Sequence, residues 1–426
     1  MDGKMAGNKD LLLVWILLVC AFDISYSLTC LDMNGNPVSW FIAYKLPRNS
    51  CPRTSGFDFM YMDAKTTMPT LLRSPVPINN QNQPIGYTLQ QVYQANQLGN
   101  QSVVYGMYND QPPPNRPSTS KGHTKGVVAL DAEYGFWLVH SVPAFPSKGS
   151  SGYSYPSNAE TFGQTLLCMT FSFAQFEQIG QQLLYNCPFF YDNFMPTSIM
   201  TSLPSLYSAM SGVCTDNTPY YRTTNLVAPN GQTFTSFAKS KTFNNDLYSA
   251  LVAPYFGYNL YTQTWRPNTP LPSYCGTPMV YNIIAITVGP DSPPGESYQF
   301  YSSQDHSKWA VTGDVDDRHP PPPLDKQVVC IGDINRESSQ FNKAGGTVCI
   351  GSANVWRAFR DAVSGAELCP ISCTMDQTKR SVNNEATNCT SESIDDGWSC
   401  PIDGAKKSSV DVMLLFIPIM TITLLW

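Results

Sequence analysis

The chain is 426 residues long, and it is poor in charged residues and in histidine. Charged residues make up 14% of it, against about 25% in an average soluble domain, so coiled coils and long solvated helices are not expected. Lys and Arg number 26 against 32 Asp and Glu, which excludes a strongly basic protein that coats nucleic acid but not a local basic cleft. With four histidines and no His-x-x-x-His or Cys-x-x-Cys pair, we expect neither a metal nor a cofactor.

Apolar and turn-forming residues are plentiful instead. Hydrophobic residues make up 42% of the chain and aromatic residues 12%, which is enough for a sizeable core and excludes wholesale disorder. The 34 prolines and 28 glycines indicate many turns and long loops.

Both ends of the chain have the form of targeting segments. An apolar run at 11–20 and a small-residue end at Ser27 predict a signal peptide over 1–27, because the run is too short to span a membrane. At the other end, a polar stalk at 373–410 leads to a hydrophobic tail at 411–426. We interpret this tail as a possible signal for a lipid anchor, with a tail retained in the membrane, or no anchor at all, as the alternatives.

The 13 cysteines indicate an oxidising compartment. One of them, Cys20, lies in the predicted leader, and its removal leaves an even number, which favours disulfides. Asn100 and Asn388 each begin an acceptable glycosylation sequon. We therefore expect a glycoprotein of the secretory pathway that is lysosomal, secreted or lipid-anchored at the cell surface.

Short apolar runs rich in β-branched or aromatic residues predict buried strands, because they lack the polar alternation of a half-exposed sheet. These runs are 40–44, 102–107, 127–130, 136–139, 282–288 and 328–331. Apolar residues at helical spacing predict helices around 173–184, 247–251 and 355–363. The mixture predicts an α/β fold in which sheets are sandwiched by helices.

A faint internal repeat divides this fold into an N-terminal half, 28–215, and a C-terminal half, 216–372. The segment 123–125 reads His-Thr-Lys, and the segment 306–308 reads His-Ser-Lys. A single His-x-Lys motif is weak, but two copies among four histidines indicate duplication. If the halves pack about a pseudo-two-fold axis, both segments enter one pocket.

Such a pocket would hold His123, Lys125, His306 and Lys308. In a strand, residues two apart point to the same face, so each lysine would lie beside its histidine. Two ammonium groups stabilise a phosphate, one neutral imidazole can form a phosphohistidine, and a protonated imidazole can serve the leaving oxygen. Neighbouring ammonium charges disfavour a protonated imidazole, so mildly acid pH should suit the pair. We assign attack to His306 and proton donation to His123, although pseudo-symmetry leaves the exchange of these roles open.

Ordered segments from Leu28 to about Cys369 resemble those of the deoxyribonuclease II family. In the first half they are Trp40-Phe41-Ile42-Ala43-Tyr44-Lys45-Leu46-Pro47, Tyr108-Asn109-Asp110-Gln111-Pro112, 122–127, 136–143 and 162–168. In the second half they are Ser236-Phe237-Ala238-Lys239, 246–249, 305–309 and Cys330-Ile331-Gly332-Asp333-Ile334-Asn335-Arg336. The resemblance implies a pseudo-two-fold, phospholipase D-like fold of mixed sheets sandwiched by helices. It also implies an acid endonuclease that hydrolyses double-stranded DNA without metal and leaves 3′-phosphate ends.

The same resemblance suggests roles for other residues. His140 is either a catalytic or a core histidine, and Asn109 and Asn335 are candidates for positioning phosphate or lysine. Lys239 and Lys241 either contact the DNA backbone or are simply solvated. The implied disulfides are Cys30–Cys168, Cys275–Cys369 and Cys330–Cys349, which leaves the pairing of Cys51, Cys187, Cys214, Cys373, Cys389 and Cys400 open.

Two other functions share the repeated motif. A phospholipase D-like phosphodiesterase would prefer a lipid headgroup to DNA. A non-catalytic secreted relative would bind DNA without cleaving it, and would be marked by loss of a histidine or lysine from either segment. Both segments are intact, which favours the enzyme.

Overall fold

The computed structural model describes residues 27–114, 117, 120–290, 297–313, 321–367 and 369. The predicted leader apart from Ser27, the stalk and the tail lie outside these residues, as do Asn388, Cys373, Cys389 and Cys400. Within the described ranges, no helix combines the length and the apolar character needed to cross a membrane.

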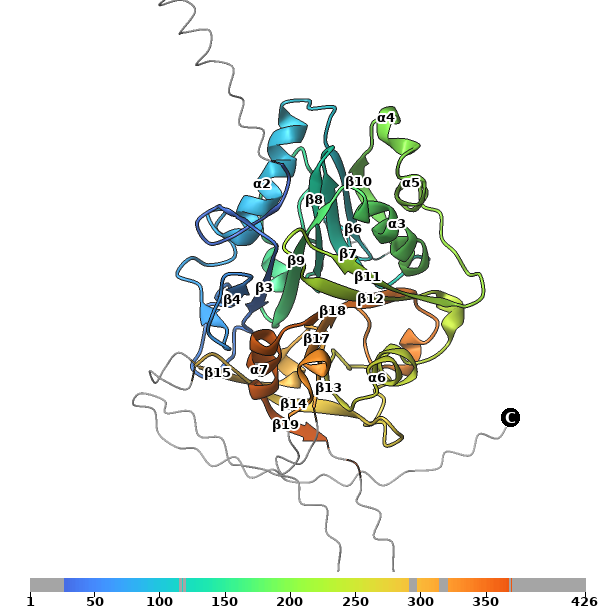
Figure 1. Ribbon diagram of the computed structural model, residues 1–426. Coiled ribbons are helices and arrows are strands. Elements are labelled where there is room, and N and C mark those ends of the chain that lie inside the picture. The colour runs from blue at the N-terminus through green and yellow to red at the C-terminus, as the bar shows by residue number, and fades with distance from the viewer. Residues whose placement is uncertain are drawn as a thin grey trace, which may run out of the picture. The chain divides into compact units, whose positions relative to one another are not determined.

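The first half of the chain builds an eight-stranded antiparallel sheet in the order β10-β6-β7-β8-β9-β3-β4-β5 (Figure 1). Its strands are β3 (Trp40–Lys45), β4 (Phe59–Asp63), β5 (Leu72–Arg73), β6 (Val104–Asn109), β7 (Lys125–Leu130), β8 (Tyr134–His140), β9 (Gln164–Ser172) and β10 (Phe190–Phe194). A short ribbon of β1 (Cys30–Leu31) and β2 (Pro37–Val38) precedes them.

The second half builds a nine-stranded sheet in the order β11-β12-β18-β17-β16-β13-β14-β15, with β19 pairing to β14. Its strands are β11 (Tyr221–Val227), β12 (Thr233–Lys239), β13 (Leu260–Gln263), β14 (Val280–Val288), β15 (Tyr298–Tyr301), β16 (Trp309–Thr312), β17 (Val328–Gly332), β18 (Gly345–Gly351) and β19 (Val363–Glu367). The sheet is mixed, because β13 and β14 run parallel while the other described pairs are antiparallel.

The two sheets repeat one strand path. The path β3-β9-β8-β7-β6 of the first sheet corresponds to β12-β18-β17-β16-β13 of the second, in chain order and in the antiparallel sense of every pair. One His-x-Lys segment runs into β7 and the other ends just before β16, which are matching strands. The fold is therefore the duplicated, phospholipase D-like α/β sandwich that the sequence predicted.

Helices cover both outer faces and fill the space between the sheets (Figure 1). The longer ones are α2 (Pro84–Gln97), α3 (Gln175–Asn186), α5 (Pro204–Met210) and α7 (Ala353–Asp361). The short ones are η1 (Ser157–Ala159), α4 (Thr197–Met200), η2 (Lys241–Phe243), the π-helical η3 (Tyr248–Val252), α6 (Ala253–Phe256), η4 (Ser302–Gln304), η5 (Leu324–Lys326) and η6 (Ser338–Gln340). Buried side chains of α2 pack on the first sheet, those of η3 and α6 pack on the second, and α3, α5 and α7 contribute to the layer between.

Strand β8 shows why the sequence lacks polar alternation. Trp137 and Val139 face the central layer between the sheets, while Phe136 and Leu138 face the layer that contains α2. Both faces of the strand are covered, so both sets of side chains are apolar. The central layer joins the two halves, and all described residues belong to one compact unit.

Disulfides link distant parts of the chain. The three pairs that the resemblance implied are present as Cys30–Cys168, Cys275–Cys369 and Cys330–Cys349. A fourth disulfide joins Cys187 to Cys214, and Cys51 is also disulfide-bonded. Asn100 of the first sequon lies exposed in the turn after α2.

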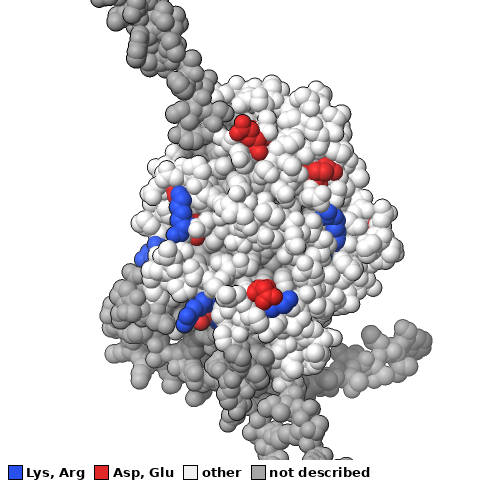
Figure 2. Space-filling view, viewed as in Figure 1, with Lys and Arg blue, Asp and Glu red and all other residues white. Residues whose placement is uncertain are grey.

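Charged side chains on the face shown in Figure 2 are few and separated by uncharged surface. Positive and negative groups are interspersed there, so this face carries no continuous basic stripe. This distribution agrees with the low overall charge, and any contacts to an anionic polymer must be local.

Candidate active site

Both His-x-Lys segments lie where a loop enters a strand. Strand β7 begins at Lys125, and β16 begins immediately after Lys308. Both histidines therefore precede the strands and do not lie within them, which corrects the strand geometry assumed from the sequence. At these strand ends, the two histidines can be reached by loops of the opposite half.

A reciprocal pair of backbone hydrogen bonds joins the two segments to opposite halves. The His123 N–H donates to Ala344 O at 2.8 Å, and the His306 N–H donates to Gly163 O at 2.9 Å. Ala344 immediately precedes β18 and Gly163 immediately precedes β9, which are matching strands. The pseudo-two-fold relation therefore extends to the hydrogen bonds that hold the histidines.

Lys308 lies directly beside His306. Its Nζ is 3.1 Å from His306 Nδ1 and also donates to the His306 carbonyl. The same His306 Nδ1 is 3.3 Å from Gln164 Oε1, on the first residue of β9. Ser141 donates to that oxygen at 2.6 Å, so a residue of the first half contacts a histidine of the second.

His123 has a different environment, because it faces a carboxylate. Its Nε2 is 3.9 Å from Asp110 Oδ2, and Lys125 donates to Asp110 Oδ1. His306 instead packs its ring against Trp265, with the ring centroids 5.6 Å apart. The two histidines are thus equivalent in the backbone but chemically distinct.

The surroundings of both histidines lower their pKa values and so disfavour their protonated forms. Burial and the Lys125 ammonium lower the pKa of His123 to about 3, while the Asp110 carboxylate opposes the shift. Burial, Lys308, Lys125 and His123 together lower the pKa of His306 well below its ordinary value. Lys125 and His123 of the first segment thus disfavour the protonated form of His306 in the second.

Asp305 fixes the shape of the second segment. Its buried carboxylate accepts from the Ser307 N–H at 3.0 Å and from the Ser307 hydroxyl at 2.5 Å. It also accepts from the hydroxyl of Tyr44, a residue of β3 in the first half. This carboxylate is therefore a bridge between the halves, and its hydrogen bonds are used for positioning.

The three residues predicted to support the catalytic segments, His140, Asn109 and Asn335, lie in different surroundings. His140 ends β8 and is buried, with Nδ1 accepting from the Val142 N–H at 3.2 Å and no partner for Nε2 among the described residues. The Asn109 side chain donates to the carbonyls of Val142 and Phe145, so it holds the loop that follows His140. Asn335 is buried, and its Oδ1 has no partner in the described part of the chain.

Lys239 does not behave as the sequence suggested. It is 0% exposed and donates to backbone carbonyls, so it is neither solvated nor available to DNA. Lys241 is exposed and lies 3.3 Å from Asp216. Asp110, Asp305 and Gln164 were absent from the predicted site; the two aspartates lie inside or beside the recognised segments, but nothing in their spacing shows what they contact.

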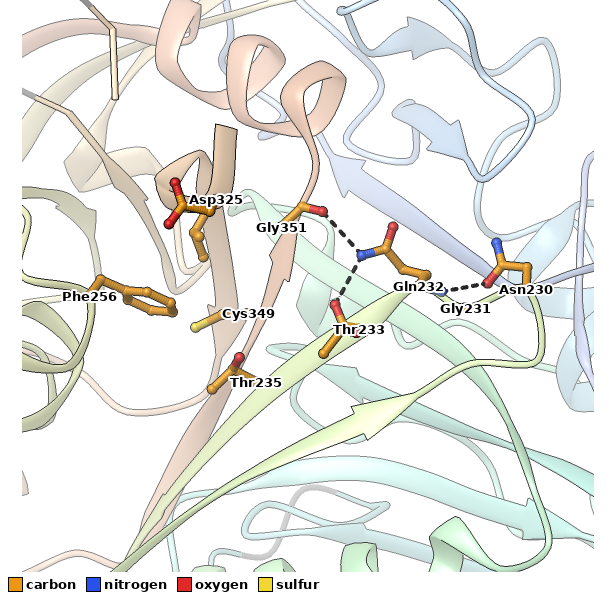
Figure 3. Close-up of a pocket in the computed structure, with 10 residues that line it drawn as sticks. Asn230, Gly231, Gln232, Thr233, Thr235, Phe256, Asp325, Cys349 and Gly351 are labelled. Atoms are coloured by element: carbon orange, nitrogen blue, oxygen red, sulfur yellow. Dashed lines mark hydrogen bonds between the residues drawn. The ribbon is translucent and has the colours of Figure 1, made fainter. Parts of the chain in front are cut away.

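A cleft lies beside β12 and β18, away from the His-x-Lys segments (Figure 3). Its volume is about 510 Å³, and Asp325 is the one ionisable side chain in its lining. The Gln232 amide in this cleft donates to the carbonyls of Thr233 and Gly351. A single carboxylate offers no nucleophile–acid pair, so this cleft is not a candidate active site.

Side chains of the types that commonly bind metal ions are dispersed over the described residues. Over the described ranges, no three His, Cys, Asp or Glu residues are grouped so that they could hold a metal ion.

A duplicated α/β sandwich with one His-x-Lys segment in each half is typical of the phospholipase D-like superfamily of phosphodiester hydrolases. Within that class, the chain belongs to the deoxyribonuclease II family, because the family's sequence model matches residues 29–369. The chain is 40% identical to deoxyribonuclease-2-alpha of Rattus norvegicus over 376 residues, covering 86% of this chain and 100% of the relative. It is 39% identical to plancitoxin-1 of Acanthaster planci over 362 residues, covering 83% and 96%. It is 35% identical to deoxyribonuclease-2 of Caenorhabditis elegans over 378 residues, covering 81% and 96%.

The Asp110 carboxylate provides a test of this electrostatic arrangement. Asp110→Asn removes the negative charge that raises the pKa of His123, so that pKa should fall further. The maximum of the pH–rate profile should then move to lower pH. Each unit by which the pKa of His123 falls lowers its protonated fraction about tenfold at a pH above that pKa. Asp325→Asn, in the other cleft, is the matched control. A maximum that stays in place or moves to higher pH would contradict the assignment.

Proposed function

We propose that this deoxyribonuclease is an acid endonuclease that hydrolyses double-stranded DNA without metal and leaves 3′-phosphate ends. The observation that supports this most strongly is the reciprocal pair of hydrogen bonds that holds His123 and His306 on opposite halves of one site. Two imidazoles and two lysines are together sufficient for phosphoryl transfer through a covalent intermediate.

The reaction starts with the neutral imidazole of His306. We assign it the tautomer in which Nδ1–H donates to Gln164 Oε1, so that Nε2, which lies 3.4 Å from Lys308 Nζ, carries the lone pair that attacks phosphorus. A P–N bond forms as the P–O5′ bond breaks, and the proton of His123 passes to the departing 5′-oxygen. Water then gives a proton to His123 and attacks phosphorus, so that the P–N bond breaks and a 3′-phosphate is released.

The assignment of the two roles rests on the different neighbours of the histidines. Asp110 stabilises the protonated form of His123, which suits a general acid. Lys308 disfavours the protonated form of His306, which suits a nucleophile. Lys125 and Lys308 provide positive charge for the phosphoryl oxygens. Burial lowers the pKa of Lys308, and the arriving phosphodiester favours its charged form.

The acid preference follows from the same charges. Burial and lysine charges lower the pKa of His123 in the free protein, so the protonated acid becomes more populated as pH falls. An arriving phosphate raises this pKa because it has the opposite charge. His306 must remain neutral, so the rate should fall on both sides of an acid maximum.

A basic cleft beside the first segment is suited to a neighbouring DNA phosphate. The cleft measures about 530 Å³ and is lined by Lys121, Lys241, Lys343 and the same Ala344 that holds His123, and by Asp216, which pairs with Lys241. Ser240 also lines it, and its buried hydroxyl has no partner among the described residues. Such a group of ammonium and hydroxyl groups recognises a sugar–phosphate backbone independently of sequence.

We also propose that the chain enters the secretory pathway and is attached to membranes through a lipid anchor that replaces its tail. The disulfides support an oxidising compartment. The apolar tail is the basis for the anchor, and lysosomal or secreted forms are the alternatives.

Plasmid digestion at acid pH with a chelator tests the function. The wild-type protein should nick the plasmid, while His306→Ala and His123→Ala should each lose about 10²-fold or more in turnover. The double variant should lose much less than the product of the two effects, because the groups act as a unit. His306→Asn should still bind DNA, since binding depends on many phosphate contacts.

Three results would contradict this proposal. Activity that is lost with chelator and restored by magnesium would refute metal-free cleavage. Hydrolysis of phosphatidylcholine vesicles in preference to plasmid would support a lipid phosphodiesterase. DNA binding without cleavage by the wild-type protein would support the non-catalytic alternative.

The basic cleft has its own test in the salt dependence of DNA binding. Lys121→Gln, Lys241→Gln and Lys343→Gln, made in the His306→Asn background, should each reduce the slope of log K against log salt by about 1. Lys326→Gln is the matched control, because Lys326 lies beyond the far end of β16. Slopes equal to that of the control would show that the cleft binds no phosphate.

The anchor is tested by changing the tail. Replacing Leu414, Leu415 and Phe416 with charged residues should release the protein into the medium. A phosphatidylinositol-cleaving lipase should release the unmodified protein from cells. An unmodified protein that is already soluble and keeps Trp426 would contradict both kinds of membrane attachment.

A further inference from the structure

Two buried lysines outside the reaction pocket occupy matching places in the two halves. Lys45 is the last residue of β3 and pairs with Gln164, the first residue of β9. Lys239 is the last residue of β12 and pairs with Gly345, the first residue of β18. Since β3 and β9 match β12 and β18 in the strand path, the pseudo-two-fold relation carries one lysine onto the other.

Lys45 holds the loop that enters β9. It is 0% exposed, and its Nζ donates to the carbonyls of Glu160 and Phe162. This loop ends at Gly163, whose carbonyl accepts the backbone N–H of His306. The Phe162 ring also packs against Trp265, the side chain that contacts the His306 ring.

Lys239 does the same for the loop that enters β18. It is 0% exposed, and its Nζ donates to the carbonyls of Gln340, Phe341 and Lys343 at 3.0, 2.9 and 2.6 Å. Three acceptors match the three N–H donors of an ammonium group. This loop ends at Ala344, whose carbonyl accepts the backbone N–H of His123.

Both lysines are suited to acid conditions. Burial lowers the pKa of Lys45 to about 7 and that of Lys239 to about 8. Both side chains are therefore charged at acid pH, and Lys239 donates to three loop carbonyls while Lys45 donates to two. A buried charge is costly unless it is hydrogen-bonded, so these loops are held in one conformation.

We propose that Lys45 and Lys239 are positioning residues that act crosswise, Lys45 on His306 of the second half and Lys239 on His123 of the first. Neither contacts the phosphate. The inference rests on the proposed function and adds the residues that set its geometry. A displacement of about 1 Å in such a group can cost roughly 10²-fold in rate, so loss of either lysine should reduce turnover on DNA by about that factor.

The crossed arrangement predicts two different defects. Lys239→Met displaces the proton donor His123, which the first step, in which the leaving group departs, does not need when that group is a good one. Lys45→Met displaces the nucleophile His306, which every substrate needs. The test compares plasmid DNA with thymidine 3′-(p-nitrophenyl phosphate), whose nitrophenolate departs without a proton. His123→Ala and His306→Ala are the matched controls for the two patterns.

We expect Lys239→Met to lose about 10²-fold on plasmid but to release the first equivalent of nitrophenolate from the ester, in a single-turnover burst, at a nearly wild-type rate, as His123→Ala should. Lys45→Met should lose activity on both substrates, as His306→Ala should. KM for plasmid and the salt slope of binding should stay at wild-type values in both variants. Near-wild-type activity on both substrates, equal losses of Lys239→Met on both, or a changed salt slope would overturn the inference.

The failure of this inference can be distinguished from that of the proposed function. A wild-type protein inactive on both substrates refutes the function, whereas an active wild type with unaffected lysine variants refutes the inference. Where a Met variant does not fold, Lys45→Gln or Lys239→Gln retains an N–H donor in the same place. Thermal unfolding of each variant identifies the folded ones, to which the same two-substrate comparison applies.

Discussion

The reciprocal exchange of backbone hydrogen bonds between the halves is the constraint on which the site depends. The His123 N–H is held by Ala344 and the His306 N–H by Gly163, so the backbone of each histidine is anchored by the other half. The apolar layer between the sheets keeps the halves in contact, and the Tyr44 hydroxyl adds a buried bond to Asp305 across the same boundary. A site of this kind exists only when both halves are folded against each other.

The chemical asymmetry of the site is imposed on a nearly symmetric backbone. Asp110, just after β6, lies beside His123, whereas Trp265, just after the matching strand β13, lies beside His306. A carboxylate favours an imidazolium, whereas burial beside Lys308 favours a neutral imidazole. Duplication thus accounts for two equivalent histidine positions, and the differences in their neighbours are the basis of the two roles proposed for them.

The sequence predicts what is repeated or strongly apolar. The strands around Trp137 and Ile331 were recognisable because both of their faces are buried, and the duplicated segments were recognisable because histidine is rare in this chain. Lys239 was misjudged because a lysine in a sequence looks solvated; its burial depends on carbonyls about a hundred residues away, whose position only the fold determines. For the same reason Asp110 could not be assigned to His123.

The roles of the two loops that enter β9 and β18 also could not be predicted from the sequence. Their residues, such as Glu160 and Gln340, act through backbone carbonyls, which every residue possesses. Side-chain identity therefore carries no signal for this function. A buried lysine at a strand end, opposite the first residue of the next strand, is the pattern that these two loops share.

Trapping the covalent intermediate tests the account most directly. DNA labelled on the strand that keeps the 3′-phosphate is mixed with excess protein and stopped with alkaline denaturant, in which a phosphohistidine survives. We predict a labelled protein–DNA adduct that peptide mass spectrometry locates on His306, and that is absent from His306→Ala. No adduct under conditions of rapid cleavage, or an adduct on His123, would contradict the account.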